Sequence, residues 1–360
     1  MLCRCAGRHH PAGLSCRITT STRLPGVEVN PLDALDLRLV HALQLDGRAP
    51  LTSIADVLGV SDQTVARRYR RLRGAGAMRV LGLADAGRFG HIEWLVRVRC
   101  TPDTASGVAG ALARRDDTSW VSLTAGGTEI VCLTRAPHRA EGASLLLQKL
   151  PRTPRVVDIS AHYILHTFFG GPTGWHGKTQ ALTDEQAERL RPRLPEPPPR
   201  GLRVPMREGD AELFATLASD GRAGYAELAV ATGWSESTVR RRLEQLRHMR
   251  ALFFDVEIDA ALLGYEAEVM LWLTVPPADL VSVAEELSGH PEVVFTAATS
   301  GQSNLVAIVV CRDIDAFYDY MSTRIGALKA VNHMESAPVL QSVKRAGRLV
   351  PARNHPFPSR

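Results

Sequence analysis

The sequence predicts an α+β chain in which two winged-type helix-turn-helix domains are each followed by a ferredoxin-like βαββαβ domain. Three observations predict this fold. The chain repeats itself at a shift of 174 residues. Each repeat opens with three short amphipathic helices, the third rich in arginine, and each then alternates strand and helix patterns in the order βαββαβ.

Composition sets the class of protein. Of 360 residues, 45% are hydrophobic and 22% are charged, close to a globular average. No window approaches the ~18 uninterrupted apolar residues of a membrane span, and the first 30 residues lack the apolar centre of a secretory signal. We expect a soluble, cytoplasmic chain without a membrane partner. The net charge of +5 permits a polyanionic partner without requiring one.

The repeat is visible in short matched motifs. Asp46-Gly47-Arg48 recurs as Asp220-Gly221-Arg222. The same shift brings Thr64-Val65 onto Thr238-Val239, Arg67-Arg68 onto Arg241-Arg242, and Gly90 onto Gly264; with one inserted residue, Gly126 meets Gly301. The chain therefore consists of two diverged copies of one two-part unit.

The copies divide the chain into segments. We expect a disordered leader (1–30), helix-turn-helix domains at 31–82 and 207–256, ferredoxin-like domains at 83–169 and 257–345, a proline-rich linker (170–206) and a tail (346–360). Thr183 and Gln186 resemble a capping box that would start a short linker helix. The leader contains Cys3, Cys5, Cys16, His9 and His10, but their spacing matches no usual zinc pattern, so we assign no metal.

The helices of the first part follow from periodicity and caps. A stripe of leucines ends at Asp46, Thr52 caps a short helix that stops at Gly59, and Ser61 or Asp62 caps a third helix from Gln63 to Arg73. Copy two repeats this pattern with helices at 226–231 and 236–249.

The third helices have the chemistry of a DNA-reading element. Short polar side chains at the helix start can reach base edges, and arginines along it can pair with guanine or phosphate. The alternative is a solvated arginine face, but its repetition at matched positions favours DNA. The candidate DNA-binding residues are Ser61, Asp62, Gln63, Thr64, Arg67, Arg68 and Arg71 in copy one, and Ser235, Ser237, Thr238, Arg240, Arg241 and Arg242 in copy two.

The second part of each copy predicts an antiparallel sheet with helices on one face. Copy one has strand patterns at 91–101, 118–124, 129–134 and 156–166, with helices at 103–115 and 140–150. Copy two has strand patterns at 266–275, 293–299, 304–311 and 331–343, with helices at 278–289 and 314–325. Because each sheet leaves one face bare, we expect the two to pack together as an internal pseudo-dimer.

Two glycine-rich hairpins are explained first as turn chemistry. The functional alternative is a backbone-lined cleft for a small amphoteric ligand. Its candidate effector-binding residues are Thr124, Gly126 and Glu129 in copy one, and Ser300, Gly301 and Asn304 in copy two.

These motifs occur in the same order in both copies, and the resulting pattern resembles the Lrp/AsnC (feast/famine) family of transcription regulators. The resemblance covers about 33–168 and 208–345 and is carried by Gly59 to Leu72, Gly233 to Leu243 and the two glycine hairpins. It implies an effector (RAM/AsnC-type) domain after each helix-turn-helix, double-stranded DNA and an amino acid or similar metabolite as partners, and homo-oligomers formed through the effector domains.

The chain departs from the family pattern at several positions. The aspartate common three residues after the hairpin glycine is Glu129 in copy one and Asn304 in copy two, and the glycine that usually ends the recognition-helix region is replaced by Met249-Arg250-Ala251. Residues 33–80 carry eight arginines against five acids, whereas 207–254 are balanced, so copy one is expected to contact DNA more tightly. Gln63 can pair with adenine and its counterpart Ser237 cannot, so half-sites ~34–36 Å apart should differ.

Two other classes remain open. Siroheme decarboxylases resemble the same two-part fold, and His162 and His166, four apart on one strand, would then share a face. The arginine-rich helices speak against that class. The third class is a ligand-sensing or scaffold protein that has lost DNA binding. No triad, phosphate loop or metal signature is present in the sequence, so we expect no enzyme and assign no catalytic residue or cofactor.

Overall fold

The computed structural model describes residues 32–137, 150–171, 179–196, 198–199 and 201–350. The expected leader with its cysteines and histidines, and the helix expected at 140–150 apart from its last residue, lie outside the described residues.

The first helix-turn-helix domain contains α1 (Ala34–Leu45), α2 (Leu51–Leu58) and α3 (Asp62–Gly74). Asp33 caps α1 in a capping box with Asp36, and Ser61 caps α3 as expected. The prediction of Thr52 as a cap is wrong: α2 begins at Leu51, so Thr52 lies inside the helix, and the N-cap residue is Pro50, which makes no side-chain hydrogen bond.

The second helix-turn-helix domain repeats this arrangement. It contains α6 (Asp210–Ser219), α7 (Tyr225–Thr232) and α8 (Glu236–His248), with Ser235 capping α8 as Ser61 caps α3. Apolar residues from all three helices form its core, including Leu213, Leu228 and Val239.

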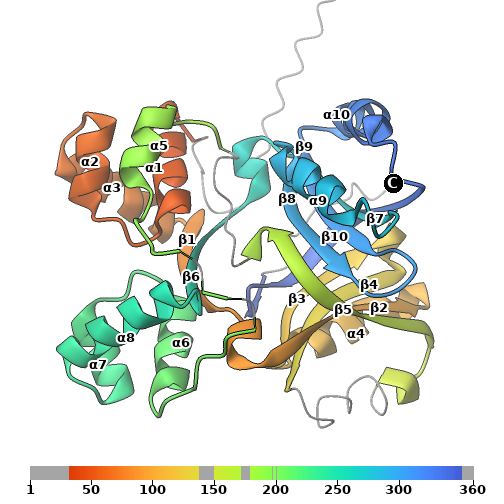
Figure 1. Cartoon of the computed structure of the whole chain (residues 1–360), viewed down its shortest axis with the longest axis horizontal. Helices are drawn as coiled ribbons and strands as arrows, with labels where there is room; N and C mark the ends of the chain where they lie inside the picture. The colour runs from red at the N-terminus through yellow and green to blue at the C-terminus, as the bar shows by residue number, and fades with distance from the viewer. Residues whose placement is uncertain (1–31, 138–149, 172–178, 197, 200, 351–360) are drawn as a thin grey trace, which may run out of the picture. The chain divides into compact units, whose positions relative to one another are not determined.

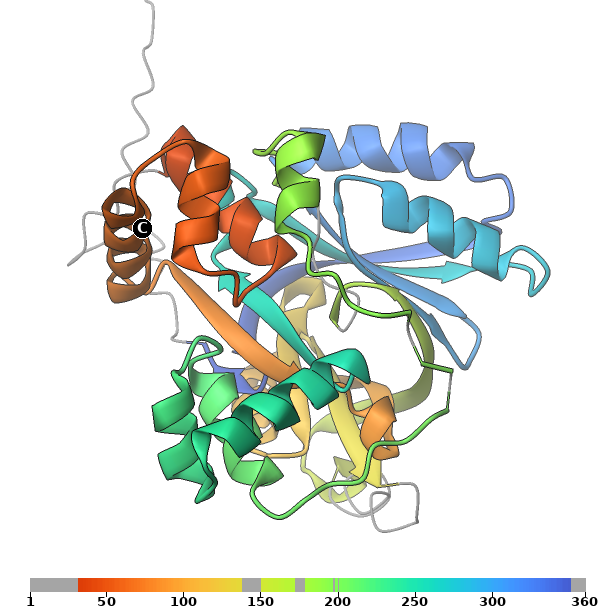
Figure 2. The ribbon, with the colours of Figure 1, turned by 60° about the vertical axis from the view of Figure 1, so that its left-hand side comes forward.

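A two-stranded ribbon that the sequence did not predict links the two domains. The strand after each third helix, β1 (Met78–Ala84) or β6 (Leu252–Ile258), pairs antiparallel with its counterpart. The packing is exchanged, since α6 packs on β1 and α1 packs on β6. Figures 1 and 2 show the ribbon passing between the two sets of helices. Each helix-turn-helix core is therefore completed by the other copy.

The two ferredoxin-like sheets join edge to edge into one closed barrel. Copy one supplies β2 (His91–Cys100), β3 (Thr118–Thr124), β4 (Glu129–Pro137) and β5 (Val156–Phe169); copy two supplies β7 (Ala267–Thr274), β8 (Val293–Thr299), β9 (Leu305–Cys311) and β10 (His333–Arg345). The long last strands make the closure, because β5 pairs with β2 and β8, and β10 pairs with β7 and β3. The short β11 (Arg348–Leu349) extends β10. Closure leaves these eight strands no open edge.

Helices cover the outside of the barrel. α4 (Pro102–Ala113) packs on β3, and α9 (Leu280–Gly289) packs on β8. α10 (Ile314–Asp319) continues as a π-helical stretch, Tyr320–Ile325, within the segment predicted as one helix. Outward-facing strand residues form a core under the helices in each copy, while inward-facing residues such as Leu95, Met270 and Phe295 form a separate inner cluster.

The linker packs on the first helix-turn-helix domain instead of forming a free spacer. α5 (Asp184–Leu190) has the predicted capping box between Thr183 and Gln186. The Gln186 amide donates to the Val57 carbonyl at 3.1 Å, and the buried His41 Nδ1 accepts the Leu182 amide at 3.1 Å. Beyond α5, Arg88 donates to the carbonyls of residues 198 and 199 at 3.2 and 2.9 Å.

Arg250 occupies a backbone position that favours glycine. Gly76 of copy one has φ +67°, and Arg250 adopts φ +53° at the equivalent place. A side chain in this left-handed region is strained by about 1–2 kcal/mol, and burial, together with the charge of Arg247, lowers the pKa of the Arg250 guanidinium. Arg250→Gly is expected to raise the free energy of unfolding by about 1 kcal/mol in urea titrations. Gly76→Arg should lower it, and equal stabilities of wild type and both variants would contradict the strain.

Candidate nucleic-acid interface

The first recognition helix, α3, separates its residues by face. Val65, Tyr69 and Leu72 are buried, whereas Gln63, Arg67 and Arg70 are exposed. The Ser61 and Thr64 hydroxyls lie 2.9 Å apart at the helix start, beside the exposed Asp62. Ser61, Gln63, Thr64, Arg67 and Arg70 also line one surface hollow. Arg70, which we did not select, therefore belongs to this face.

Two predicted DNA-binding arginines of α3 are engaged within the domain. Arg68 donates to Asp33 at 2.5 Å and to Asp36 at 2.9 Å, and Arg71 pairs with the other oxygen of Asp36. The hydrogen bond from Arg68 holds the pKa of Asp33 below its usual value. These ion pairs hold α3 against α1. Because carboxylates of the same domain already neutralise both arginines, neither is free to bind phosphate.

Arg242 is a correction to the predicted interface. It is the counterpart of Arg68, but it is only 2% exposed. Its Nε donates to the buried Asp210 at 2.9 Å, and its guanidinium also reaches Gln245 and the Pro205 carbonyl, each at 3.0 Å. A buried charge needs such partners, and Arg242 is a core residue of the second domain rather than a DNA contact.

The remaining predicted residues of α8 lie at its exposed start and face. The Ser235 hydroxyl is 2.9 Å from those of Ser237 and Thr238. Arg241 is exposed, and the guanidinium of Arg240 lies 4.8 Å from the centre of the Tyr225 ring.

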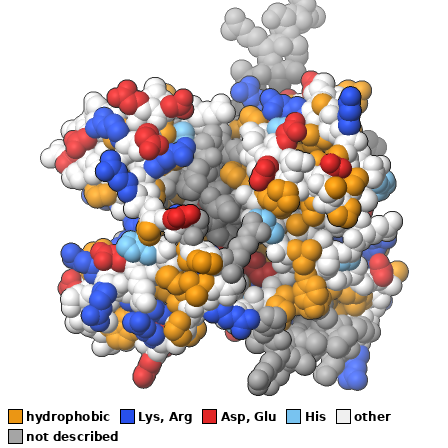
Figure 3. Space-filling model, in the orientation of Figure 1, with side chains coloured by type: hydrophobic (Ala, Val, Ile, Leu, Met, Phe, Trp, Pro, Cys, Tyr) orange, Lys and Arg blue, Asp and Glu red, His pale blue; other side chains and the backbone are white. Residues whose placement is uncertain are grey.

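The exposed faces of the two recognition helices differ in charge. Gln63, Arg67 and Arg70 on α3 correspond to Ser237, Arg241 and Glu244 on α8. A glutamate thus replaces an arginine at one matched position, which repels phosphate. In the view of Figure 3, acidic and basic side chains intermingle over both helix-turn-helix domains. Tighter DNA contact by the first domain stays a prediction.

The repeated Asp-Gly-Arg motif holds the two helix-turn-helix domains together. Arg48 donates to the carbonyls of Gly221 at 2.8 Å and Ala223 at 3.1 Å, and Arg222 donates to the Gly47 carbonyl at 2.6 Å. Burial lowers the pKa of both guanidinium groups. The motif is visible in the sequence, but only the tertiary structure shows that the arginine of each copy bonds the backbone of the other copy.

Matched ion pairs reinforce this contact. Arg73 at the end of α3 pairs with Asp220 at 2.7 Å, and its counterpart Arg247 on α8 pairs with Asp46 at 3.2 Å. The ends of both recognition helices are therefore fixed by the opposite domain, which sets the separation of the two exposed starts.

The predicted effector residues of copy one are engaged inside the barrel. Glu129 is 2% exposed and accepts from Arg97 at 3.0 and 3.1 Å and from Arg99 at 3.3 Å. Arg97 also reaches Glu335 at 2.6 Å and stacks on the Trp272 ring at 3.9 Å. The Thr124 hydroxyl donates to the Glu129 carbonyl at 3.4 Å, and Gly126 forms the turn with φ +71°.

The predicted effector residues of copy two also bond other residues of the protein. The Ser300 hydroxyl accepts the Tyr163 amide at 2.9 Å, and the Asn304 side chain bonds both the amide and the carbonyl of Val275, at 2.9 and 2.7 Å. Gly301 lies so close to the His162 ring that an added Cβ would be 2.3 Å from Nδ1. Effector binding at these six residues stays a prediction.

The two histidines of β5 do not share a face. A bulge interrupts the pairing of β5 with β8 between Ile164 and His166, and Ile164 and Thr167 both line the barrel cavity. His166 instead stacks edge-on against Phe168. Burial and the charge of Arg97 lower the pKa of His162. The spacing of four residues did not predict a shared face, because the bulge adds one residue to the strand between the two histidines.

Comparison with known families matches the first part of both copies and the second part of copy two. A family model of the AsnC-type helix-turn-helix domain matches residues 32–73 and 208–247, and one of the Lrp/AsnC ligand binding domain matches 268–349. No helix in the described ranges has the length and apolar character needed to cross a membrane.

Several characterised sequences align with less than half of the chain. HTH-type transcriptional regulator FL11 of Pyrococcus horikoshii is 28% identical over 41% of this chain and 98% of its own length. HTH-type transcriptional regulator Ptr1 of Methanocaldococcus jannaschii is 26% identical over 39% of this chain and 95% of its own. The crystal structure of the siroheme decarboxylase NirDL covers 87% of this chain and 93% of its own, with TM-score 0.60 and 13% identity, which shows a shared fold alone.

Proposed function

We infer, because this chain belongs to the Lrp/AsnC family of transcription regulators, that it binds specific DNA sequences with two unlike helix-turn-helix domains. The observation that carries this inference is the pair of exposed recognition-helix starts, held at a fixed separation by the exchanged Asp-Gly-Arg contacts. Gln63 and Arg67 lead the reading of DNA in copy one, and Ser237 and Arg241 in copy two.

A small metabolite modulates this binding, and several chains assemble in the cytoplasm through their effector domains. The βαββαβ domain of copy two supports this proposal, because it matches the ligand-binding domain of the family. Each βαββαβ domain also lies directly after a helix-turn-helix.

The two recognition helices should contribute unequally. Arg67→Ala is expected to weaken DNA binding at least tenfold, and Arg241→Ala only a few-fold, because Glu244 already weakens the attraction of α8 for phosphate. Fluorescence anisotropy on DNA from upstream of the chain's own gene measures both, at two salt concentrations. Each lost phosphate contact should reduce the slope of log affinity against log salt by about one.

Arg114→Ala provides a matched control, since Arg114 is exposed at the end of α4 on the barrel. Selection from random DNA should recover an imperfect palindrome. Equal losses from Arg67→Ala, Arg241→Ala and Arg114→Ala, or a perfectly symmetric selected site, would contradict the unequal reading.

A siroheme-decarboxylase-like activity is the alternative on this fold. That hypothesis required His162 and His166 on one face of β5, and the bulge places them on different faces. We therefore propose no reaction for this chain.

A further inference from the structure

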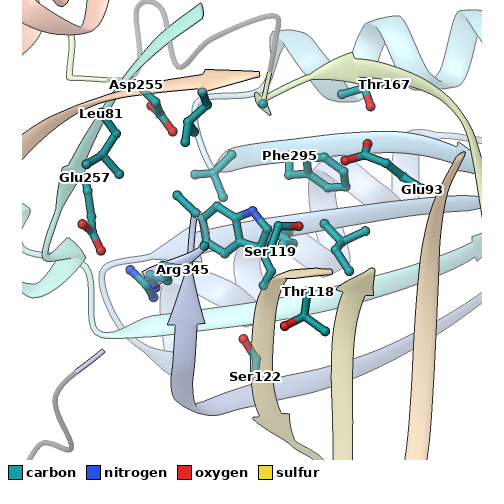
Figure 4. Close-up of a pocket in the computed structure, with 18 of the residues that line it drawn as sticks. Leu81, Glu93, Thr118, Ser119, Ser122, Thr167, Asp255, Glu257, Phe295 and Arg345 are labelled. Carbon is teal, nitrogen blue, oxygen red and sulfur yellow. The ribbon is translucent and has the colours of Figure 1, made fainter. Parts of the chain in front are cut away.

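A cavity of about 370 Å³ lies between one end of the barrel and the β1–β6 ribbon. Strand residues of both copies line it, most of them apolar, and Figure 4 shows Phe295 and Glu93 on the barrel side with Leu81 and Asp255 on the ribbon side. Its size and apolar lining are those of a small-molecule site.

This cavity is distinct from the two glycine hairpins. On β2 it is lined by Glu93 and Leu95, whereas the first hairpin meets β2 at Arg99. On β9 it is lined by Val306, Ile308 and Val310, so it begins one residue beyond Leu305, where the second hairpin joins β9. None of the six candidate effector residues of the hairpins is among the described residues that line the cavity.

The charges around the cavity are mainly negative. Its lining includes the acids Asp85, Glu93, Asp116, Asp255, Glu257 and Glu268, and the arginines Arg135 and Arg345. Both arginines are already neutralised, Arg135 by Glu93 at 3.2 Å and Arg345 by Glu268 at 2.7 Å, and Glu257 is paired with Arg79. An anionic ligand would find no free cation among these described residues.

Two polar side chains of the lining lack the partner their chemistry needs. In the described part of the chain, Asp255 accepts only the amide of its neighbour Val256, at 2.8 Å, and forms no ion pair. Burial, with a further contribution from Glu257, raises the pKa of Asp255 to about 6. The Ser119 hydroxyl, on a residue 5% exposed, has no hydrogen-bond partner among the described residues. A bound ligand would satisfy both groups.

Aromatic rings complete the chemistry of the lining. Trp120, Phe253 and Phe295 come from β3, β6 and β8 and all line the cavity. Aromatic faces attract cations as well as apolar groups, and together with an unpaired carboxylate they favour an ammonium ion.

We propose that this cavity is an effector site for a small molecule with an apolar body and an ammonium group. Asp255 is the counter-ion of the ammonium, and the Ser119 hydroxyl bonds a polar atom of the ligand. The role as effector rests on the proposed function; the binding chemistry does not.

The ribbon gives such a ligand a direct route to the DNA-binding helices. Leu81, Phe253 and Asp255 line the cavity, while Val80, the neighbour of Leu81, belongs to the core of the first helix-turn-helix domain. Val256 belongs to that core and also lines the cavity. A ligand that moves the ribbon therefore changes how the two helix-turn-helix domains dock, and with it the separation of α3 and α8.

The binding test uses the full chain and two probes with the same apolar body, 4-phenylbutylamine and 4-phenylbutyrate. Calorimetric titration is expected to show binding of the amine and at least tenfold weaker binding of the carboxylate. Asp255→Asn should lower the affinity for the amine at least tenfold, while Glu285→Gln, an exposed acid on α9, should not change it. Because a carboxyl with a raised pKa destabilises the fold when ionised, Asp255→Asn should be more stable than wild type at pH 8 and lose this advantage at pH 4, so lost binding cannot reflect unfolding.

The outcomes separate the two proposals. Absence of amine binding, equal binding of the carboxylate, or unchanged amine affinity in Asp255→Asn would overturn the cavity proposal without touching DNA binding. DNA anisotropy is then measured with and without 4-phenylbutylamine. A shift of at least threefold in wild type, absent in Asp255→Asn, supports the effector role, and an unchanged DNA affinity with the amine bound overturns it. Absence of DNA binding in every condition contradicts the proposed function and leaves the ligand chemistry standing.

Discussion

Asp210→Ala is expected to lower the free energy of unfolding by about 3–5 kcal/mol, because it leaves the charge of Arg242 buried without a counter-ion. Asp210 is fully buried and accepts two hydrogen bonds from Arg242 and one from the Arg207 amide. Gln245 and the Pro205 carbonyl remain as partners of Arg242, but neither carries a charge. Urea unfolding followed by far-ultraviolet circular dichroism measures the loss.

Asp36→Ala is the matched comparison from copy one. Its partners Arg68 and Arg71 have side chains 23% and 44% exposed, so both can turn to water, and the expected loss is about 1–2 kcal/mol. Asn at position 210 should recover part of the stability by accepting a hydrogen bond. Equal losses in Asp36→Ala and Asp210→Ala would show that burial of the Asp210–Arg242 pair carries no special cost.

Gly221→Ala is expected to separate the two helix-turn-helix domains. An added Cβ would lie 2.8 Å from the carbonyl carbon of Leu81 and 3.0 Å from the amide nitrogen of Gly82, and backbone atoms cannot move aside as a side-chain end can. We expect a loss of about 3 kcal/mol in stability and at least tenfold weaker DNA binding, since the separation of the recognition helices changes with the docking.

The control for this substitution is Gly107→Ala. Gly107 lies inside α4, where an added Cβ meets nothing within 4 Å, so this change should stabilise the chain by about 0.5–1 kcal/mol. Chemical-shift or fluorescence probes on α3 and α8 should report altered docking only in Gly221→Ala. Wild-type DNA affinity in that variant would contradict the role of the exchanged contacts.

Local elements and the repeated architecture could be read from residues close in sequence. The caps at Ser61 and Ser235, the left-handed glycine at the end of α2 and the capping box of Thr183 and Gln186 each determined an element within its own turn. The strands β3 and β8 begin and end where alternation predicted. Such signals depend on hydrogen bonds spanning a few residues, so the sequence is sufficient for them.

The site was predicted less completely, because the roles of identical arginines depend on what lies opposite them. The sequence gives no reason to distinguish Arg67, Arg68 and Arg71. In the structure, Asp33 and Asp36 pair with Arg68 and Arg71, whereas Arg67 is exposed. Arg242 was selected for DNA and is buried instead. The unpredicted strands β1 and β6 pair with each other across 174 residues, a contact that no local pattern specifies.

The sequence by itself thus determined the class of each half, the duplication and the two arginine-rich third helices. Periodicity and capping act at short range, and the repeat is visible in the sequence itself. Only the tertiary structure decided that the sheets close into one barrel and that the Asp-Gly-Arg motifs exchange partners between copies. It also decided that Asp255 lines a cavity whose two arginines are paired with other carboxylates. These features arise where two copies meet, and the side chains that meet there are far apart along the chain.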